Sequence, residues 1–278
     1  MEVLRTRLIT AAVALPFLAW TIFLGPLWFY NLVVLFFTFV ALREFAAMAL
    51  EGQQGATAMV MAGGMTIALA TGIARSADAV SAGIVLCLAG VLLGTLATSR
   101  RDDTDMQARV NMAGQILLGC LYGGLLMPHF ISVRYLPDNG PEWVFFVLGC
   151  VMAGDAGGYF GGRAFGKRPL WPSVSPKKTV EGALASFAGS LLLGSTINLL
   201  VLQALGPIEA LFVAGAVNVL AQVGDLLESM VKRAYGAEDS GWLIPGHGGV
   251  LDRTDSLVLP IVFVYYYAIL SRGYLQLP

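Results

Sequence analysis

The sequence predicts an all-α integral membrane protein, a polytopic helical bundle of about nine transmembrane helices. Of its 278 residues, 57% are hydrophobic and only 13% are charged, whereas soluble domains carry about 25% charged residues. Several apolar runs approach the roughly 20 residues that cross a bilayer as a helix. Strand-like alternation does not recur. We therefore expect a single membrane-embedded domain over residues 1–278, with no separate soluble domain.

Apolar runs define the expected spans in chain order. They cover residues 8–24, 27–42, 56–74, 79–98, 110–133, 143–160, 182–205, 208–227 and 256–271. Pro16, Pro128 and several glycines interrupt them, which spanning helices tolerate where neighbouring groups satisfy the freed backbone. The first run follows two arginines, as a secretory signal peptide would. Because it passes directly into a second apolar run with no polar mature start, we expect it to remain as a helix.

The distribution of basic residues predicts the orientation. If the N-terminus is cytoplasmic, all but three of the 17 Lys and Arg residues fall on the cytoplasmic side of the nine spans. The exceptions are Arg75, Arg134 and Arg272. Cytoplasmic loops of membrane proteins carry an excess of positive charge. The sequence therefore predicts an N-in, C-out arrangement.

Three cysteines lie singly inside apolar runs, at Cys87, Cys120 and Cys150. They have no CxxC spacing and no nearby histidine, which metal sites and redox motifs would show. Free cysteines are commonly buried as small apolar side chains. We expect packing thiols rather than metal ligands or disulfides.

Polar residues concentrate on the predicted cytoplasmic side, within residues 154–255. The first segment, residues 154–182, carries five basic residues and no acid between Arg163 and Lys178, flanked by several glycines. Glycine lets backbone N–H groups approach an anion closely, and Lys and Arg add charge, so the segment suits phosphate. An ordinary positively charged loop touching anionic lipid head groups has the same composition, and this alternative stays open.

A helix start is predicted at Ser175, because Pro176 follows it and Glu181 precedes the next apolar run. Proline is accepted in a first helical turn, and the free N–H groups there attract anions. Lys177 and Lys178 at such a start would form a small phosphate site.

Asp155 differs from these residues because it lies inside an apolar run rather than at its edge. A carboxylate within a membrane span is costly unless it is paired. We expect it to pair with a cation, a metal or one of the nearby basic residues.

The second segment runs from Asp225 to Asp255 and is dense in polar and glycine residues. Asp225, Ser229 and Lys232 are spaced i, i+4 and i+7, so they share one face of a helix. Asp252 and Asp255 share a face at the start of the last span. Paired carboxylates are the oxygen ligands that Mg²⁺ bound to phosphates needs.

Glycines also surround the histidine of this segment, at Gly246, Gly248 and Gly249 around His247, where the backbone could wrap a phosphate. Each element alone has a plainer interpretation: a solvated helix face, a tight turn, or a satisfied polar histidine. Together at a membrane surface these elements favour a role in phosphoryl or nucleotidyl transfer over a purely structural role. The residues alone predict a cytoplasm-facing, metal-dependent enzyme that acts on a phosphate, with a lipid co-substrate.

At these residues the chain resembles the phosphatidate cytidylyltransferases, also called CDP-diacylglycerol synthases. Their signature matches Ser229, Lys232, Arg233, Asp239, His247, Gly248, Gly249, Asp252, Arg253 and Asp255. The upstream segments GRAFGK, residues 162–167, and SPKKTVEG, residues 175–182, are similar as well. One position departs from the pattern: the family has Lys before the signature Asp, and this chain has Glu238. An acid there reverses the local charge beside the predicted triphosphate site.

The resemblance implies phospholipid biosynthesis by the reaction CTP + phosphatidate → CDP-diacylglycerol + pyrophosphate. It also implies nine spans, a homodimer, and an active site on the cytoplasmic face of the inner membrane. CTP, phosphatidate and membrane lipids are the implied partners, with no nucleic acid. The implied Mg²⁺ ligands, with a second cation as an open alternative, are Asp225, Asp252 and Asp255. The implied catalytic residues are Ser229, Lys232, Arg233, Arg253 and Asp155. The implied substrate-binding residues are Lys167, Ser175, Lys177, Lys178, His247, Gly248 and Gly249.

Two alternatives stay open. Another CTP-using lipid enzyme, of the CDP-archaeol synthase or polyprenol kinase type, would share the topology and the phosphate chemistry, although the complete signature from Ser229 to Asp255 argues against it. A lipid-binding or transporter-like relative without catalysis is the second, and Glu238 is its only hint in the sequence. An assay with CTP and phosphatidate separates all three.

Overall fold

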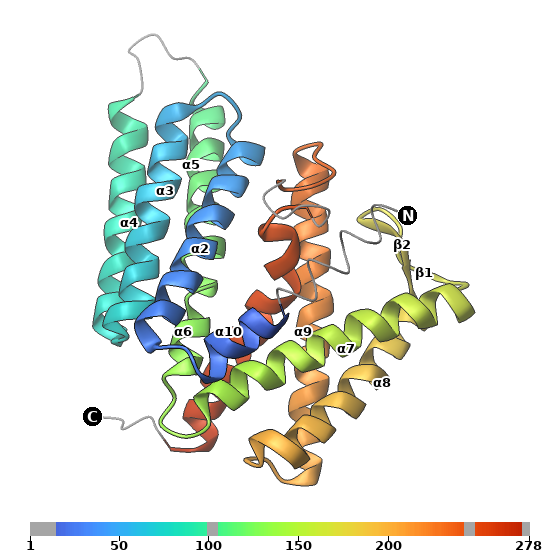
Figure 1. Ribbon diagram of the computed structural model, residues 1–278. Coiled ribbons are helices and arrows are strands. Elements are labelled where there is room, and N and C mark those ends of the chain that lie inside the picture. Colours follow the sequence, from blue (N-terminus) through green and yellow to red (C-terminus); the bar gives the residue numbers. More distant parts are fainter. Residues whose placement is uncertain (1–14, 99–104, 242–247, 274–278) are drawn as a thin grey trace. The chain divides into compact units, whose positions relative to one another are not determined.

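A computed structural model describes residues 15–98, 105–241 and 248–273 of the chain. Within these ranges it has helices α2 to α10 and a single two-stranded hairpin (Figure 1). Eight of its helical segments are long and apolar enough to cross a membrane. The predicted class, a polytopic helical membrane protein, is confirmed. The first predicted span is described only from residue 15, and residues 15–23 are helical.

The eight segments overlap the second to ninth predicted spans in order. They are α2 (Leu27–Ala49), α3 (Gln54–Leu69) with the π-helical turn η1 (Ala70–Ala74), α4 (Ala77–Ala97), α5 (Met106–Leu121) with η2 (Tyr122–Leu126) and α6 (His129–Arg134), α7 (Gly140–Phe165), α8 (Val180–Ile197) with η3 (Asn198–Leu202), α9 (Pro207–Ala234) and α10 (Leu251–Ser271).

Helix α2 runs on to Ala49, past the predicted end at residue 42. The expected boundary stood before Arg43 and Glu44, where the apolar run ends. Charge ends an apolar run but not a helix, because Arg, Glu, Ala and Met are all good helix formers. Glu44 is consequently a buried residue near the end of a spanning helix.

The chain forms two compact units. Unit 1 is Met1–Ser132 with Asp239–Asp252, and unit 2 is Val133–Glu238 with Arg253–Pro278. In unit 1, helices α2, α3 and α5 pack on one another around a core that includes Leu42, Val60 and Ile116. Cys87 and Cys120 lie in this core and Cys150 lies in α7; all three are buried and unbridged, as predicted.

In unit 2, helix α7 packs along α8, and α8 packs on α9 (Figure 1). Small residues permit the close approach of α7 and α8. A Cβ atom on Gly157 would lie 2.6 Å from the carbonyl oxygen of Ala185. Such small-residue contacts are a usual device between membrane helices. These contacts fix the position of α7, the helix on which Asp155 lies.

The segment between α7 and α8 corrects the predicted helix start at Ser175. Strands β1 (Pro169–Trp171) and β2 (Ser175–Thr179) pair in antiparallel fashion. Ser175 precedes a proline, which disfavours helical backbone at that residue. Helix α8 begins only at Val180, where the Thr179 hydroxyl accepts a hydrogen bond from the Gly182 N–H at 3.1 Å. Lys177 and Lys178 therefore lie on a strand that precedes the helix.

The base of this hairpin is held by Glu181, in the first turn of α8. Its Oε2 accepts hydrogen bonds from the backbone N–H groups of Lys167 at 3.0 Å and Arg168 at 3.1 Å. Its Oε1 pairs with Nε of Arg168 at 2.9 Å. The turn after α7 is thereby tied to the start of α8, which sets the position of the hairpin lysines.

Candidate functional site

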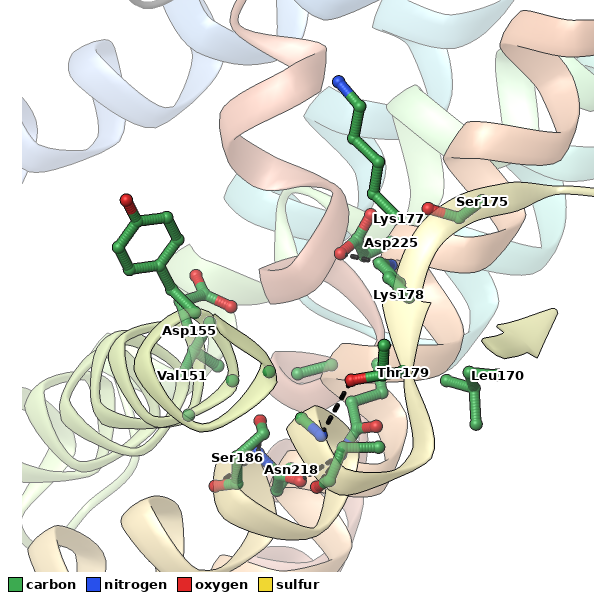
Figure 2. A pocket seen from close by; sticks show the side chains of 18 of the residues that line it. Val151, Asp155, Leu170, Ser175, Lys177, Lys178, Thr179, Ser186, Asn218 and Asp225 are labelled. Carbon is green, nitrogen blue, oxygen red and sulfur yellow. Dashed lines mark hydrogen bonds and ion pairs between the residues drawn. The ribbon is translucent and has the colours of Figure 1, made fainter. Parts of the chain in front are cut away.

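Unit 2 contains a cavity of about 720 Å³ between three helices and the hairpin (Figure 2). Helix α7 contributes one wall, α8 and α9 contribute the floor and a second wall, and the hairpin covers the remaining side. The lining residues with polar or charged side chains are Asp155, Tyr159, Arg163, Ser175, Lys177, Lys178, Thr179, Ser186, Asn218, Gln222 and Asp225. The cavity thus brings the first polar segment of the sequence together with Asp225 of the second.

Cations of the hairpin face carboxylates of the helices in this cavity. Nζ of Lys178 lies 2.5 Å from Oδ2 of Asp225, and the two side chains are about a third exposed, at 28% and 34%. Asp155, on α7, interacts electrostatically with Asp225, Lys178 and Arg253. In Figure 2 Lys178 turns toward Asp225, whereas Lys177 extends away from that pair. The expected basic neighbours of Asp155 are therefore present.

A buried polar network forms the floor of the cavity. Nδ2 of Asn218 donates hydrogen bonds to the hydroxyls of Ser186 at 2.9 Å and Ser190 at 2.7 Å. Oδ1 of Asn218 accepts one from Nε2 of Gln222 at 2.5 Å. Our sequence analysis missed this network, although a signal existed: Asn218, Gln222 and Asp225 are spaced i, i+4 and i+7 along one face of α9. The polar surface thus extends from Asp225 into the membrane span.

Asp225, Ser229 and Lys232 all lie on α9, as predicted, but the two charged residues have different ion-pair partners. Lys232 pairs with Oε2 of Glu228 at 2.6 Å, one turn before it, while Asp225 pairs with Lys178. Glu228 is only 2% exposed, and our sequence analysis did not include it. Ser229 is half-buried, and the exposed Arg233 follows at the end of α9.

Asp255 is buried near the start of α10. Its Oδ1 accepts hydrogen bonds from the Ser256 N–H at 2.7 Å and the Ser256 hydroxyl at 3.1 Å. It also interacts electrostatically with Asp225 and Lys232. Arg253 is exposed. Across the described ranges, no three His, Cys, Asp or Glu side chains lie close enough together to hold a metal ion.

The remaining signature residues lie in unit 1, where Asp252 organises its own segment. Its Oδ2 accepts hydrogen bonds from the N–H groups of Ser240 at 3.0 Å and Gly249 at 2.9 Å, and from the Ser240 hydroxyl at 2.9 Å. Gly248 has φ of +81°, a conformation that favours glycine. The Gly249 N–H is therefore directed at Asp252 rather than toward a phosphate.

Four further positions that the sequence singled out are Lys167, Gly246, His247 and Glu238. Lys167 is exposed and does not line the cavity; its backbone N–H is the group that bonds Glu181. His247 lies outside the described residues, as does Gly246. Glu238, where the chain departs from the signature, is exposed.

Fold and cavity together define an integral membrane protein whose second unit contains a polar cavity lined by both lysines and carboxylates. Comparison with known proteins narrows this class. A model of the cytidylyltransferase family matches residues 5–271. The chain belongs to this family.

Several curated relatives of this chain are named phosphatidate cytidylyltransferase. Phosphatidate cytidylyltransferase of Synechocystis is 31% identical over 294 aligned positions, covering 95% of this chain and 96% of that protein. The enzyme of that name from Brucella suis is 32% identical, covering 96% of this chain and 94% of the relative. The Bacillus subtilis protein is 39% identical over a shorter match, which covers 55% of this chain and 57% of that protein.

Proposed function

We propose that this chain is a phosphatidate cytidylyltransferase, which converts CTP and phosphatidate into CDP-diacylglycerol and pyrophosphate. The observation that carries the proposal is the unit 2 cavity, in which Lys178 of the hairpin pairs with Asp225 and interacts with Asp155, while Lys177 lines the same cavity. Near full-length relatives named for this activity support the choice of substrates.

In this proposal the protein mainly positions and neutralises its substrates. An oxygen of the phosphatidate phosphate attacks the α-phosphorus of CTP in line, the bond between that phosphorus and the bridging oxygen to the β-phosphate breaks, and pyrophosphate leaves. Phosphoryl-type transfers of this kind depend on alignment and on stabilising negative charge. Lys177 and Lys178 would bind phosphate oxygens, and Lys178 would then share its charge between the substrate and Asp225.

Other basic residues would serve the triphosphate. Lys232, Arg233 and Arg253 would neutralise the charge that develops as pyrophosphate departs, with Ser229 orienting a phosphate. Gly248 and Gly249 would let the backbone approach the triphosphate closely, with groups other than the Gly249 N–H, which is bonded to Asp252. Lys167 and His247 complete the proposed substrate-binding set.

The carboxylates of the site have the chemistry that Mg²⁺ requires. They are hard oxygen donors, Asp255 and Asp155 both interact with Asp225, and Asp225 already holds a cationic ammonium group. We propose that Asp225 and Asp255 would hold Mg²⁺. Asp252, the third ligand that the resemblance implies, lies in unit 1 and stays a prediction of the sequence, as does a second cation. The bound cation would neutralise triphosphate oxygens and so ease the departure of pyrophosphate.

The active site would face the cytoplasm, where CTP is available, in a homodimer of the inner membrane. A single cysteine placed by Lys177→Cys tests this topology with a membrane-impermeant thiol reagent. Labelling in lysed but not in intact cells is expected. Labelling from outside intact cells would overturn the N-in orientation.

The activity itself is tested on purified protein with radiolabelled CTP and phosphatidate. We expect a labelled lipid product and pyrophosphate in equal amounts. The double variant Lys177→Ala, Lys178→Ala should lose this turnover, while Arg75→Gln, an exposed basic residue outside the cavity, should keep it. Transfer to an ether lipid or a polyprenol in place of phosphatidate, or no labelled lipid at all, would reject the proposal.

A further inference from the structure

We infer that Glu44 is a positioning residue for the signature segment that contains Asp252. The inference rests on the proposed function only for the chemical consequence; the contacts themselves lie wholly in unit 1. Glu44 belongs to α2, outside both polar segments of the sequence and outside the signature motif. Its side chain reaches residues about 200 positions further along the chain.

The carboxylate of Glu44 accepts hydrogen bonds from two backbone N–H groups at the start of α10: those of Val250, just before the helix, and Leu251, its first residue. Its Oε1 lies 3.0 Å from the N–H nitrogen of Val250, and its Oε2 lies 2.8 Å from that of Leu251. The residue is only 8% exposed. The initial N–H groups of a helix have no partner within the helix, and the positive end of the helix dipole favours an anion there. Glu44 therefore satisfies the start of α10 with a charge supplied by another helix.

Ser240 links this carboxylate to Asp252. The Ser240 hydroxyl lies 3.4 Å from Oε2 of Glu44 and 2.9 Å from Oδ2 of Asp252. The same hydroxyl oxygen accepts a hydrogen bond from the Asp252 N–H at 3.2 Å. Because a hydroxyl donates one proton, the shorter contact to Asp252 is the stronger one. The strong hydrogen bonds of Glu44 are thus those to the backbone N–H groups of Val250 and Leu251. Ser240 in turn orients the side chain of Asp252.

Two glycines, Gly241 and Gly249, allow the backbone around Asp252 to pack directly against the Glu44 carboxylate. A Cβ atom on Gly249 would lie 2.7 Å from Oε2 of Glu44, and one on Gly241 would collide with the same carboxylate. A side chain at either position would displace the segment or the carboxylate. Gly249, the last glycine of the GHGG sequence, thus has a steric reason to be glycine, beyond any contact with substrate.

An amide cannot replace this carboxylate without loss. In Glu44→Gln the side-chain oxygen can accept from one backbone N–H, but the NH₂ group then meets the other donor. A buried donor left without an acceptor destabilises the local structure. The first turn of α10 should loosen, and with it the orientation of Asp252. The cavity lysines and carboxylates of unit 2 keep their own contacts.

The test compares Glu44→Gln with Glu51→Gln, an exposed glutamate just beyond α2. In the first measurement, hydrogen exchange on purified protein, the Val250 and Leu251 amides should exchange at least tenfold faster in Glu44→Gln, while α3 and α5 stay as protected as in the parent. In the second, steady-state kinetics, KM for CTP should rise at least fivefold with KM for phosphatidate unchanged. Glu51→Gln should match the parent in both.

Each other result decides against the inference. Exchange and KM values equal to those of Glu51→Gln would overturn it. A fall in turnover with both KM values unchanged, and faster exchange throughout unit 1, would indicate a purely structural residue. If Glu44→Gln does not fold, Ser240→Ala takes its place; it should raise KM for CTP at least threefold, and no change would refute the link to Asp252. A parent protein inactive with CTP and phosphatidate rejects the proposed function instead, and the exchange measurement still tests the anchor.

Discussion

Replacing Lys178 with glutamine separates the structural from the functional role of the hairpin lysine. Nζ of Lys178 lies 2.5 Å from Oδ2 of Asp225, and both side chains are about a third exposed, at 28% and 34%. Exposed ion pairs contribute about 0.2–1 kcal/mol, because water screens the charges and the long side chain loses freedom. Lys178→Gln should therefore lower the free energy of unfolding by no more than about 1 kcal/mol.

The effect on catalysis should be larger. If Lys178 donates to a phosphate oxygen in the transition state, a hydrogen bond to a charged group is lost, which is worth about 1.5–3 kcal/mol. At about 1.4 kcal/mol for each factor of ten, kcat/KM for phosphatidate should fall by about 10- to 150-fold. The loss of activity would then exceed what the loss of stability explains.

Arg168→Gln provides the matched control. Arg168 is a basic residue near the same hairpin that does not line the cavity. The substitution removes its side-chain contact with Glu181 but keeps the backbone N–H hydrogen bond that ties the hairpin to α8. Initial rates with radiolabelled CTP, measured on protein whose folding is checked by denaturant titration, give both quantities for each variant. A reduction in kcat/KM of less than threefold for Lys178→Gln, or one equal to that of Arg168→Gln, would refute a role of Lys178 in binding phosphate.

Three further predictions concern α9, α10 and the segment between them. Lys232→Gln should lower the free energy of unfolding by about 3 kcal/mol, because it leaves the buried Glu228 carboxylate without its ion-pair partner. Adding Glu228→Gln to this variant should restore the stability measured by denaturant titration. A double variant as unstable as Lys232→Gln alone would contradict this pairing. Asp252→Asn or Asp255→Asn should abolish turnover in folded protein, and EDTA should inactivate the parent until Mg²⁺ is restored; near-normal activity at saturating Mg²⁺ removes the residue from the proposed metal site. Glu238→Lys should change KM for CTP less than tenfold, since Glu238 is exposed; a tenfold fall would place this side chain against the triphosphate.

Most of the helical architecture follows from the sequence, because a spanning helix satisfies its backbone within one continuous segment. The apolar runs therefore located eight segments that the structure also has. The end of α2 was misplaced because Arg43 and Glu44 interrupt the apolar run but not the helix. The hairpin was missed because a short strand in a charged loop leaves no apolar pattern, and its pairing depends on two pieces of chain meeting.

The candidate site was predictable in its residue types and not in its pairings. Asp155, Lys178 and Asp225 were identified from their position beside or within apolar runs, and the structure places all three around one cavity. The partner of Lys178 could not be read from spacing, since Lys178 lies on strand β2 and Asp225 lies far along the chain on α9. Spacing along α9 placed Asp225 and Lys232 on one face but did not identify the partner of Lys232, which is Glu228, one turn before it.

The sequence by itself therefore determined the membrane class, the order of the spans and the two segments that contain the polar chemistry. These properties are local: a bilayer requires apolar runs of a given length, and it makes charged residues within them conspicuous. Only the tertiary structure decided which charged and hydrogen-bonding groups contact one another. Glu44 and Leu251 are separated by 207 positions and joined by one hydrogen bond. Such contacts depend on how distant segments fold onto each other, and no periodicity or motif along the chain encodes them.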